Sequence, residues 1–428
     1  MKLYAWQRNC LHAWQKHNYR GIINAVTGSG KTRLALSAIR LLQKEYPKLR
    51  IRVVTPTIAL ANQWRQAILR DSASHGELPG FYGDGTRDDS DRTVMIYVVN
   101  SARNGLADHI RTDFAQQYPV LLICDECHRY LSKENYRMFE FLTGELSDFP
   151  LYHCLGLSAT PFGNERDSAL RRVLGEEIFQ YDFSDAAADG VIAPHVIGQI
   201  AVSFLPEEGR EYAALCDKIS RAAAMFYQTY PRVKDLPSGR FMKELRRLAA
   251  ESDMDPSDPA AALLLLLYQR KNLVVTSEAR IRCCLSLLNH LDRDRRILIF
   301  CERIDQAETL YRQILRAWGS ICGIYHSELS KEARQRNLED FRRKRTRILV
   351  SCRALDEGLD VPDASVGIVL SSSAVRRQRI QRLGRIVRTD PDKDYACLYY
   401  IYIRESSEDA AYLPLTDHAR VFDLKYFT

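Results

Sequence analysis

Short apolar runs recur along the first 165 residues, and segments with helical periodicity lie between them. The runs that we predict to be β-strands are Ile22–Val26, Ile51–Thr55, Val94–Val99, Val120–Cys124 and Cys154–Leu157. Arg33–Glu45 and Ile58–Leu69 have the apolar spacing of helices that cover a sheet. Regular alternation of strands and helices predicts a parallel α/β sheet.

The same alternation returns near the end of the chain. Strands are predicted at Ile297–Cys301, Ile321–Tyr325, Arg347–Ser351, Val366–Leu370 and Ala396–Ile401, with helices at Asp305–Trp318 and Lys331–Arg343. The middle instead has helical periodicity, around Glu207–Tyr227, Gly239–Ala250 and Ala260–Arg270. We therefore predict an α/β domain over 1–165, a connecting segment with a mostly helical insert over 166–290, and a second α/β domain over 291–428.

Composition is that of an ordinary globular protein with a basic surplus. The 428 residues are 46% hydrophobic and 27% charged, which excludes global disorder, and the net charge of +7 weakly favours a polyanionic partner. The eleven cysteines form no disulfide framework, and the N-terminus has no apolar leader, so we expect a cytoplasmic protein. The leucine run Leu263–Leu267 is too short to span a membrane and predicts a buried helix.

A glycine-rich turn follows the first predicted strand. Ala25 stands where the common P-loop pattern has its first glycine, and Thr27, Gly28, Ser29, Gly30, Lys31 and Thr32 complete the loop. Glycines allow backbone N–H groups to face a phosphate chain, and the start of a helix adds partial positive charge. We predict that Lys31 contacts the β- and γ-phosphates of ATP and that Thr32 binds Mg²⁺.

Two adjacent carboxylates, Asp125 and Glu126, follow the strand Val120–Cys124. Asp125 is suited to hold Mg²⁺, and Glu126 is suited to activate the water that attacks ATP. Cys124 and Cys127 form a C-x-x-C, but no second pair lies at the spacing of zinc ligands, so a metal-thiolate site is disfavoured. ATP and Mg²⁺ are therefore the predicted cofactors.

From this point the chain resembles the DExH helicases of superfamily two. The motifs follow in the family's order: residues 125–128 resemble the DExH box, 55–57 motif Ia, 158–161 motif III, 297–301 motif IV, 356–362 motif V and 378–388 motif VI. The form of motif V and the helical middle are most similar to the XPB, RadD and UvsW branch, whose members act mainly on DNA. The resemblance implies two RecA-like domains with ATP held between them.

Further site residues are implied by the resemblance. Arg385 and Arg388 would reach the γ-phosphate across the cleft, although the arginine repeat alone would equally fit a solvated basic helix face. Gln381 would couple to the ATP site, Gly358 would approach the γ-phosphate, and Asp360 would accept a hydrogen bond from the ribose. Gln7 would read the adenine edge, although Trp6 stands where a tyrosine is usual.

Nucleic-acid contacts are implied at Pro56 and Thr57 in motif Ia. The usual phosphate-binding threonine before motif V falls on Cys352, beside Ser351, and this departure puts one backbone contact in doubt. The basic stretch 331–347 favours a solvated helix face over a phosphate-tracking patch, because acidic residues interrupt it.

These motifs fit an ATP-driven helicase or translocase that acts on DNA more readily than on RNA. A nucleotide-gated clamp that recruits partners without unwinding needs the same motifs and stays an alternative, as does an RNA helicase. No nuclease motif is evident, so a nuclease or other effector subunit would have to come from another protein. DNA repair, recombination and anti-phage defence all suit such a motor, and no membrane partner is expected.

Overall fold

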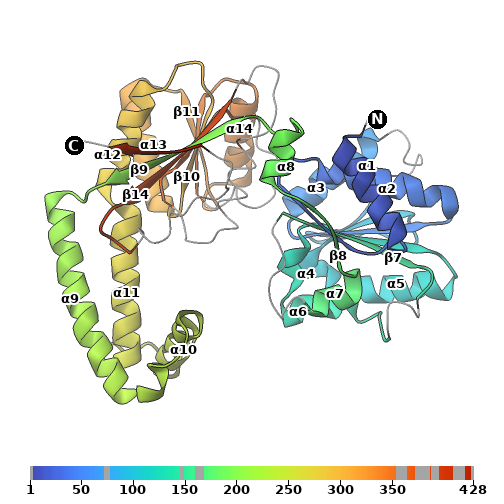
Figure 1. Ribbon diagram of the computed structural model, residues 1–428, viewed down its shortest axis with the longest axis horizontal. Helices are drawn as coiled ribbons and strands as arrows, with labels where there is room; N and C mark the ends of the chain where they lie inside the picture. The colour runs from blue at the N-terminus through green and yellow to red at the C-terminus, as the bar shows by residue number, and fades with distance from the viewer. Residues whose placement is uncertain are drawn as a thin grey trace.

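The chain forms two mainly parallel β-sheets, each flanked by helices, joined through a helical segment (Figure 1); only the short β4 pairs antiparallel, with β3, among the described strands. This computed structural model describes residues 3–71, 78–144, 149–159, 168–352, 364–371, 386, 395–407 and 420–425. The predicted α/β class is confirmed, and so are the predicted strands, with bounds that differ by at most two residues.

The first sheet has eight strands in the order β4-β3-β5-β2-β6-β7-β1-β8. Its strands are β1 (Ile22–Ala25), β2 (Arg50–Thr55), β3 (Gly80–Gly83), β4 (Thr86–Arg87), β5 (Val94–Val98), β6 (Val120–Cys124), β7 (Tyr152–Ser158) and β8 (Glu177–Tyr181). Its helices are α1 (Ala5–Lys16), α2 (Lys31–Glu45), α3 (Ile58–Arg70), α4 (Val99–Ala102), α5 (Leu106–Ala115), α6 (Lys133–Tyr136) and α7 (Ser168–Leu174), with 3-10 turns η1 (Cys127–Tyr130) and η2 (Arg137–Phe139).

Both faces of this sheet are buried, which explains why its central strands are continuous apolar runs. Along β6, Leu121 and Ile123 pack in one hydrophobic cluster, whereas Leu122 and Cys124 pack in the other. Because the strands run parallel, the loops after β1, β2, β6 and β7 all emerge at one edge of the sheet. This edge therefore gathers the sequence motifs of the first domain.

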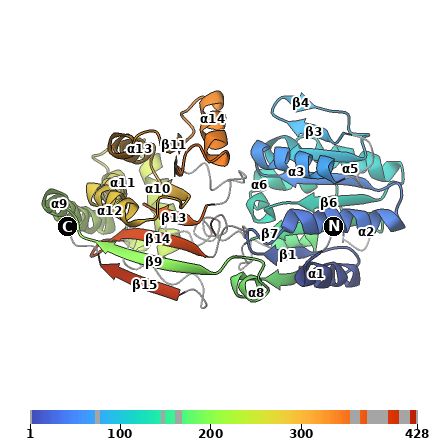
Figure 2. The ribbon, with the colours of Figure 1, turned by 90° about the horizontal axis from the view of Figure 1, so that it is seen from above.

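The second sheet has seven strands in the order β11-β12-β10-β13-β14-β9-β15. Its strands are β9 (His195–Val202), β10 (Ile297–Cys301), β11 (Cys322–Tyr325), β12 (Ile348–Cys352), β13 (Val366–Val369), β14 (Ala396–Ile403) and β15 (Arg420–Lys425). Helices α12 (Glu278–His290), α13 (Ile304–Trp318) and α14 (Lys331–Arg342) belong to this half. In Figure 2, β14, β9 and β15 lie side by side.

Residues 166–290, predicted as a connecting segment, supply a strand to each sheet. β8 pairs with β1 in the first sheet, and β9 pairs with β14 and β15 in the second. Glu177 and Gln180 interrupt the half-exposed edge strand β8, and the Gly198-Gln199 step interrupts β9, so neither strand appears as a continuous apolar run. Between the sheets lies the short helix α8 (Phe183–Ala188).

A helical arm extends from the second sheet (Figure 1). It consists of α9 (Pro206–Thr229), the 3-10 turn η5 (Pro231–Val233), α10 (Ser238–Glu251) and α11 (Pro259–Thr276), which share a small core of their own. The predicted helical insert is confirmed. Of the leucine run, Leu263 and Leu264 are buried, whereas residues 265–267 are only half-buried.

In the described part of the chain, no helix combines the length and the apolar character needed to cross a membrane.

Candidate ATPase and nucleic-acid site

The loop after β1 has the geometry of a phosphate-binding loop. Gly28 and Gly30 have φ values of 89° and 96°, in the left-handed region where a side chain would be strained. The Ser29 hydroxyl donates to the Val26 carbonyl at 2.7 Å and fixes the curl of the loop. Lys31 begins α2, and its Nζ donates to the Ala25 carbonyl at 2.9 Å and lies 3.4 Å from that of Val26.

The chemistry of this loop fits a phosphate chain with Mg²⁺. The hydroxyl of Thr27 is buried and has no hydrogen-bond partner among the described residues, so it has an unused donor and acceptor within the loop. Thr32 lies in the first turn of α2, where the helix start attracts anions. The Lys31 ammonium bonds to two carbonyl oxygens of the loop, those of Ala25 and Val26. A phosphate oxygen could take their place as the acceptor.

Gln7 is fully buried, and its amide is tied to the phosphate loop. Its Nε2 donates to the Gly30 carbonyl at 3.1 Å, and its Oε1 accepts from the Tyr4 backbone N–H at 3.0 Å. A Cβ at position 30 would lie 3.0 Å from this Nε2, so the close approach also favours glycine there. The predicted site residue is thus placed beside the loop, while the adenine contact itself stays a prediction.

Asp125 follows β6 directly and is nearly completely buried. Its Oδ2 accepts from Trp64 Nε1 at 2.8 Å, and its Oδ1 accepts from the Glu126 backbone N–H at 3.0 Å. Burial, with the neighbouring Glu126 charge, raises the pKa of Asp125 to about 6, while the Trp64 bond and the Lys31 ammonium act to lower it. Lys31 and Asp125 therefore belong to one electrostatic site.

Glu126 adopts a left-handed backbone conformation with φ of 49°, which is uncommon for a residue with a Cβ. Its Oε2 is buried, accepts no hydrogen bond within the described residues, and lies 3.5 Å from His128 Nδ1. The same His128 nitrogen lies 3.0 Å from the hydroxyl of Ser158 at the end of β7. The described start of motif III is thereby linked to the acidic pair.

The C-x-x-C pair is not arranged for metal binding. Cys124 and Cys127 are both buried, and burial raises the pKa of each thiol well above its ordinary value. Across the part of the chain that the structure describes, no cluster of three histidine, cysteine or acidic side chains could hold a metal ion. The thiols serve as core packing on either side of the acidic pair.

Pro56 and Thr57, the predicted nucleic-acid contacts, are half-buried in the turn between β2 and α3. The Thr57 hydroxyl accepts from the Leu60 backbone N–H at 3.3 Å and so caps α3. In the second sheet, Ser351 and Cys352 end β12. Ser351 is buried, whereas Cys352 lines a cavity of about 570 Å³.

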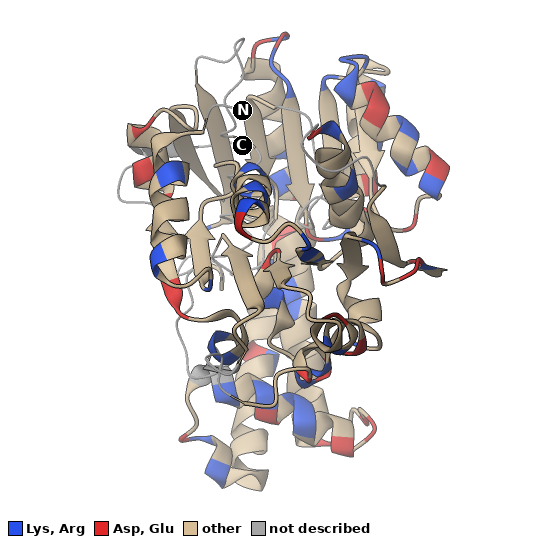
Figure 3. Ribbon diagram, turned by 90° about the vertical axis from the view of Figure 1, so that its right-hand side faces the viewer, with Lys and Arg blue, Asp and Glu red and all other residues tan. Residues whose placement is uncertain are grey.

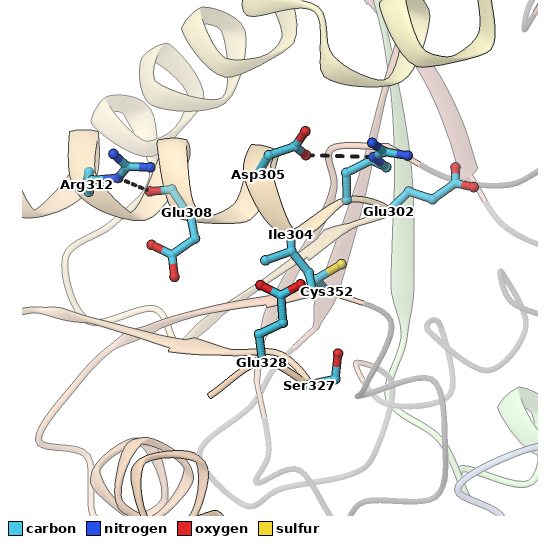
Figure 4. Close-up of a pocket in the computed structure, with 9 residues that line it drawn as sticks. Glu302, Ile304, Asp305, Glu308, Arg312, Ser327, Glu328 and Cys352 are labelled. Carbon is cyan, nitrogen blue, oxygen red and sulfur yellow. Dashed lines mark hydrogen bonds and ion pairs between the residues drawn. The ribbon is translucent and has the colours of Figure 1, made fainter. Parts of the chain in front are cut away.

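This cavity lies at the carboxyl edge of the second sheet (Figure 4). Glu302, Asp305, Glu308 and Glu328 bring four carboxylates to its lining, where Arg303 and Arg312 also lie. Lys271 pairs with Glu302 and Arg303 pairs with Asp305, so the lining keeps only a modest excess of negative charge toward a phosphate backbone. The doubt over the contact at Cys352 is thus joined by unfavourable electrostatics of its surroundings.

The basic stretch 331–347 is partly neutralised by its own acidic residues. Arg343 pairs with Glu339 at 2.7 Å, and Arg345 pairs with Asp340 at 3.1 Å. Figure 3 shows the same mixture of charge along the helices, with Lys and Arg interspersed with Asp and Glu. These pairs favour the interpretation as a solvated helix face.

Several predicted site residues lie outside the described residues: Thr160, Pro161, Gly358, Asp360, Gln381, Arg385 and Arg388. Their roles remain predictions.

Two residues around Asp125 were not predicted. Trp64 donates to its carboxylate, and the Tyr130 hydroxyl donates to the backbone carbonyls of Asp125 and Val54 at 2.6 and 3.0 Å. Tyr130 lies within five residues of the acidic pair, so its position in the sequence could have marked it as a candidate for this site. Trp64 is 61 residues away in sequence, and only the fold brings it to the site.

Comparison with known proteins agrees with this geometry. Residues 1–163 match the family "Type III restriction enzyme, res subunit", and residues 279–390 match "Helicase conserved C-terminal domain". The DNA 3'-5' translocase XPB2 of Sulfurisphaera tokodaii is 28% identical over 91% of this chain and 79% of its own length. The DNA 3'-5' helicase XPB of Kineococcus radiotolerans is 22% identical over 91% of this chain.

The chain spans a smaller share of the other relatives. It covers 58% of the Kineococcus protein and 48% of a putative DNA 3'-5' helicase Rad25 of Haloarcula marismortui, which is 26% identical over 87% of this chain.

Solved structures share the fold. The helicase domain of Pyrococcus furiosus Hef matches with a TM-score of 0.57 at 14% identity over 95% of this chain and 97% of that one. Saccharomyces cerevisiae Dbp5 matches with a TM-score of 0.60 at 15% identity over 99% of this chain and 90% of that one.

A phosphate loop and a buried acidic pair, in a chain with two parallel sheets, define a P-loop ATPase with two RecA-like domains. The motifs, the fold and these matches identify the chain as a helicase-type protein of superfamily two that is most similar to members of the XPB branch.

Proposed function

We propose that this chain is an ATP-dependent DNA helicase or translocase that hydrolyses ATP between its two α/β domains. The observation that carries the proposal is the pairing of the Lys31 loop with the buried Asp125–Glu126 pair at one sheet edge. A second sheet in the same chain supplies the partner domain that a motor needs. A phosphate-loop kinase or GTPase would leave this second sheet unexplained.

Each residue of the loop and acidic pair has a role in this proposal. The backbone of residues 27–30 and the Lys31 ammonium would hold the phosphates, and Thr32 and Asp125 would hold Mg²⁺. Bound Mg²⁺ would offset the negative charge of the phosphate oxygens. Glu126 Oε2 is positioned to accept a proton from the attacking water, because it is buried and accepts no described hydrogen bond.

The residues outside the described part complete the proposal. Arg385 and Arg388 would stabilise charge on the γ-phosphate, and Gln381 would couple to the ATP site. Gly358 and Asp360 would contact the γ-phosphate and the ribose.

DNA is the proposed substrate, and 3'-5' the proposed direction, because the relatives that cover most of the chain are named as DNA 3'-5' translocases and helicases. We place its role in DNA repair, with recombination and anti-phage defence as further settings. A nuclease or other effector subunit is the proposed protein partner. The nucleotide-gated clamp without unwinding remains the second candidate, because no wedge element is identified.

The test is an ATPase assay with single-stranded, duplex and forked DNA and with RNA, beside a strand-displacement assay. We expect DNA to stimulate hydrolysis more than RNA, and Lys31→Ala to abolish it while the circular dichroism spectrum stays unchanged. Hydrolysis in Lys31→Ala at the wild-type rate would refute the assignment of the site. Stimulated hydrolysis without strand displacement would favour translocation alone or the clamp.

A further inference from the structure

The β2–α3 segment holds the acidic pair from two sides. The Asp125 backbone N–H donates to the Val54 carbonyl at 3.0 Å, and Tyr130 donates to that same carbonyl. From α3, the indole N–H of Trp64 reaches the Asp125 carboxylate at 2.8 Å. Between these anchors, in the turn from β2 to α3, lie Pro56 and Thr57. The proposed metal carboxylate and the proposed nucleic-acid contacts are thus tied to one segment.

The link through Trp64 is direct and rigid. Trp64 is completely buried on α3, so its side chain cannot turn away without repacking the core. The hydroxyl of Thr57 caps the same helix at its first turn. A displacement of that first turn would therefore move the whole helix and, with it, the Trp64 indole N–H that donates to Asp125. Among the described residues, the carboxylate of Asp125 accepts one side-chain hydrogen bond, from Trp64, and one backbone hydrogen bond, from Glu126.

We propose that Trp64 is a positioning residue that carries the engagement of nucleic acid at the start of α3 to the Asp125 carboxylate. The inference rests on the proposed function, because it requires that Asp125 helps to hold Mg²⁺ with ATP. Bound DNA would set the position of α3, and the Trp64 bond would hold the carboxylate in the orientation that favours Mg²⁺. DNA and Mg²⁺–nucleotide would then strengthen the binding of each other.

The test measures how Mg²⁺ supports binding of a fluorescent, non-hydrolysable ATP analogue, with and without a single-stranded oligonucleotide. In wild type we expect DNA to lower the half-saturating Mg²⁺ concentration about fivefold or more, as in ordinary coupled sites. In Trp64→Phe, which keeps an aromatic ring and removes the N–H donor, this effect of DNA should disappear. Affinity for DNA without nucleotide should stay within about twofold, because no DNA contact is removed.

Trp14→Phe is the matched control. Trp14 is also fully buried, and its Nε1 donates to the Cys154 carbonyl at 2.9 Å, away from the acidic pair. Both variants lose one indole hydrogen bond and similar volume, so a general loss of stability would affect them alike. If Trp64→Phe does not fold, a benzothienylalanine at position 64 keeps the bicyclic shape and replaces only the N–H by sulfur.

The outcomes separate this inference from the proposed function. Coupling that survives in Trp64→Phe, or that Trp14→Phe loses to the same degree, would overturn the role of Trp64. So would a wild-type protein whose Mg²⁺ requirement is indifferent to DNA, even if DNA stimulates its ATPase. A wild-type protein that binds no Mg²⁺–nucleotide at all would instead overturn the proposed function.

Discussion

Glu126 combines a strained backbone with a buried oxygen that accepts no described hydrogen bond. A left-handed residue with a Cβ costs roughly 1–2 kcal/mol, and such conformations persist where the surrounding structure over-determines them. Here the residue directly follows Asp125, whose backbone and side chain are both held, and it precedes the η1 turn. These neighbours hold Glu126 in its left-handed backbone conformation, and that conformation sets the direction of its side chain.

We predict that Glu126→Gln binds ATP but hydrolyses it at least about 10²-fold more slowly, because an amide keeps the shape and loses the basicity. It should accumulate as a complex with ATP and DNA together. Single-turnover hydrolysis and a DNA-binding curve with ATP measure the two effects. Glu134→Gln, at an exposed glutamate in the same domain, is the control and should hydrolyse normally. Turnover of Glu126→Gln within a few fold of wild type would show that Glu126 is not the catalytic carboxylate.

Individual residues differ in how far the sequence could predict them. Lys31, Asp125 and Glu126 were predictable because the loop and the acidic pair are each contiguous, and both follow apolar strands. Trp64 was not, because nothing local distinguishes a tryptophan that packs in a core from one that donates to a carboxylate. Cys352 was predicted as a doubtful contact, and its acidic surroundings became visible only through residues from several elements.

At the scale of elements, the root of the arm is fixed by one buried arginine. Arg280 of α12 is fully buried, and its guanidinium donates to the carbonyls of Val274 at 2.9 Å, Leu370 at 2.7 Å and Ile401 at 2.5 Å. Val274 belongs to α11, Leu370 directly follows β13, and Ile401 belongs to β14. Glu208 of α9 adds to the root by accepting from the Ser277 hydroxyl at 2.9 Å. The arm is thus attached rigidly to the second sheet.

We predict that Arg280→Met lowers the free energy of unfolding by about 2–4 kcal/mol, because it leaves buried carbonyls without their charged donor. Urea unfolding followed by circular dichroism measures the change. Arg282→Met is the control on the same helix, since Arg282 is exposed and pairs only at the surface with Glu278. That control should change stability by less than about 0.5 kcal/mol. Equal losses in the two variants would contradict the assigned role of Arg280.

Helices and strands could be predicted where burial imposes a regular pattern of apolar residues on the sequence, and could not be predicted where burial imposes no such pattern. The central strands, buried on both faces, stand out as apolar runs. β9 also lies between two strands, β14 and β15, but half of its residues are only partly buried, and its chain position places it before the arm rather than within the second run of strands. Pairing between β9 and β14, whose partners such as His195 and Ala396 lie 201 residues apart, is set by tertiary packing, which no local pattern encodes.

At the scale of the whole molecule, hydrolysis is expected to need both domains. We predict that Arg385→Ala and Arg388→Ala each lower kcat far more than they weaken ATP binding, because an arginine finger acts mainly in the transition state and can contribute about 10³–10⁵ in kcat. Arg379→Ala, at another arginine of motif VI (residues 378–388), is the control and should lower kcat much less. Measurements of kcat at saturating ATP and DNA, beside DNA binding without nucleotide, check this. Weaker DNA binding with normal kcat would favour a nucleic-acid-binding face instead.

We also predict strong dependence of DNA binding on salt. Contacts with the phosphate backbone release counterions, so the Kd for DNA should rise by at least about tenfold between roughly 50 and 200 mM salt. Fluorescence anisotropy with a labelled oligonucleotide measures it, and kcat at saturating DNA serves as the control that should change little. A Kd that is indifferent to salt would argue against backbone tracking.

The rigid root of the arm has a geometric consequence for motion. α9 has 24 residues, so the arm is roughly 36 Å long at about 1.5 Å per residue. If the second domain turns by about 15° against the first, as packed units do in known switching proteins, the arm would swing with it and its tip would travel roughly 9 Å. That distance exceeds two base-pair steps of about 3.4 Å each. In such a rotation the arm would convert a small change of angle at its root into a displacement of its tip on the scale of DNA itself.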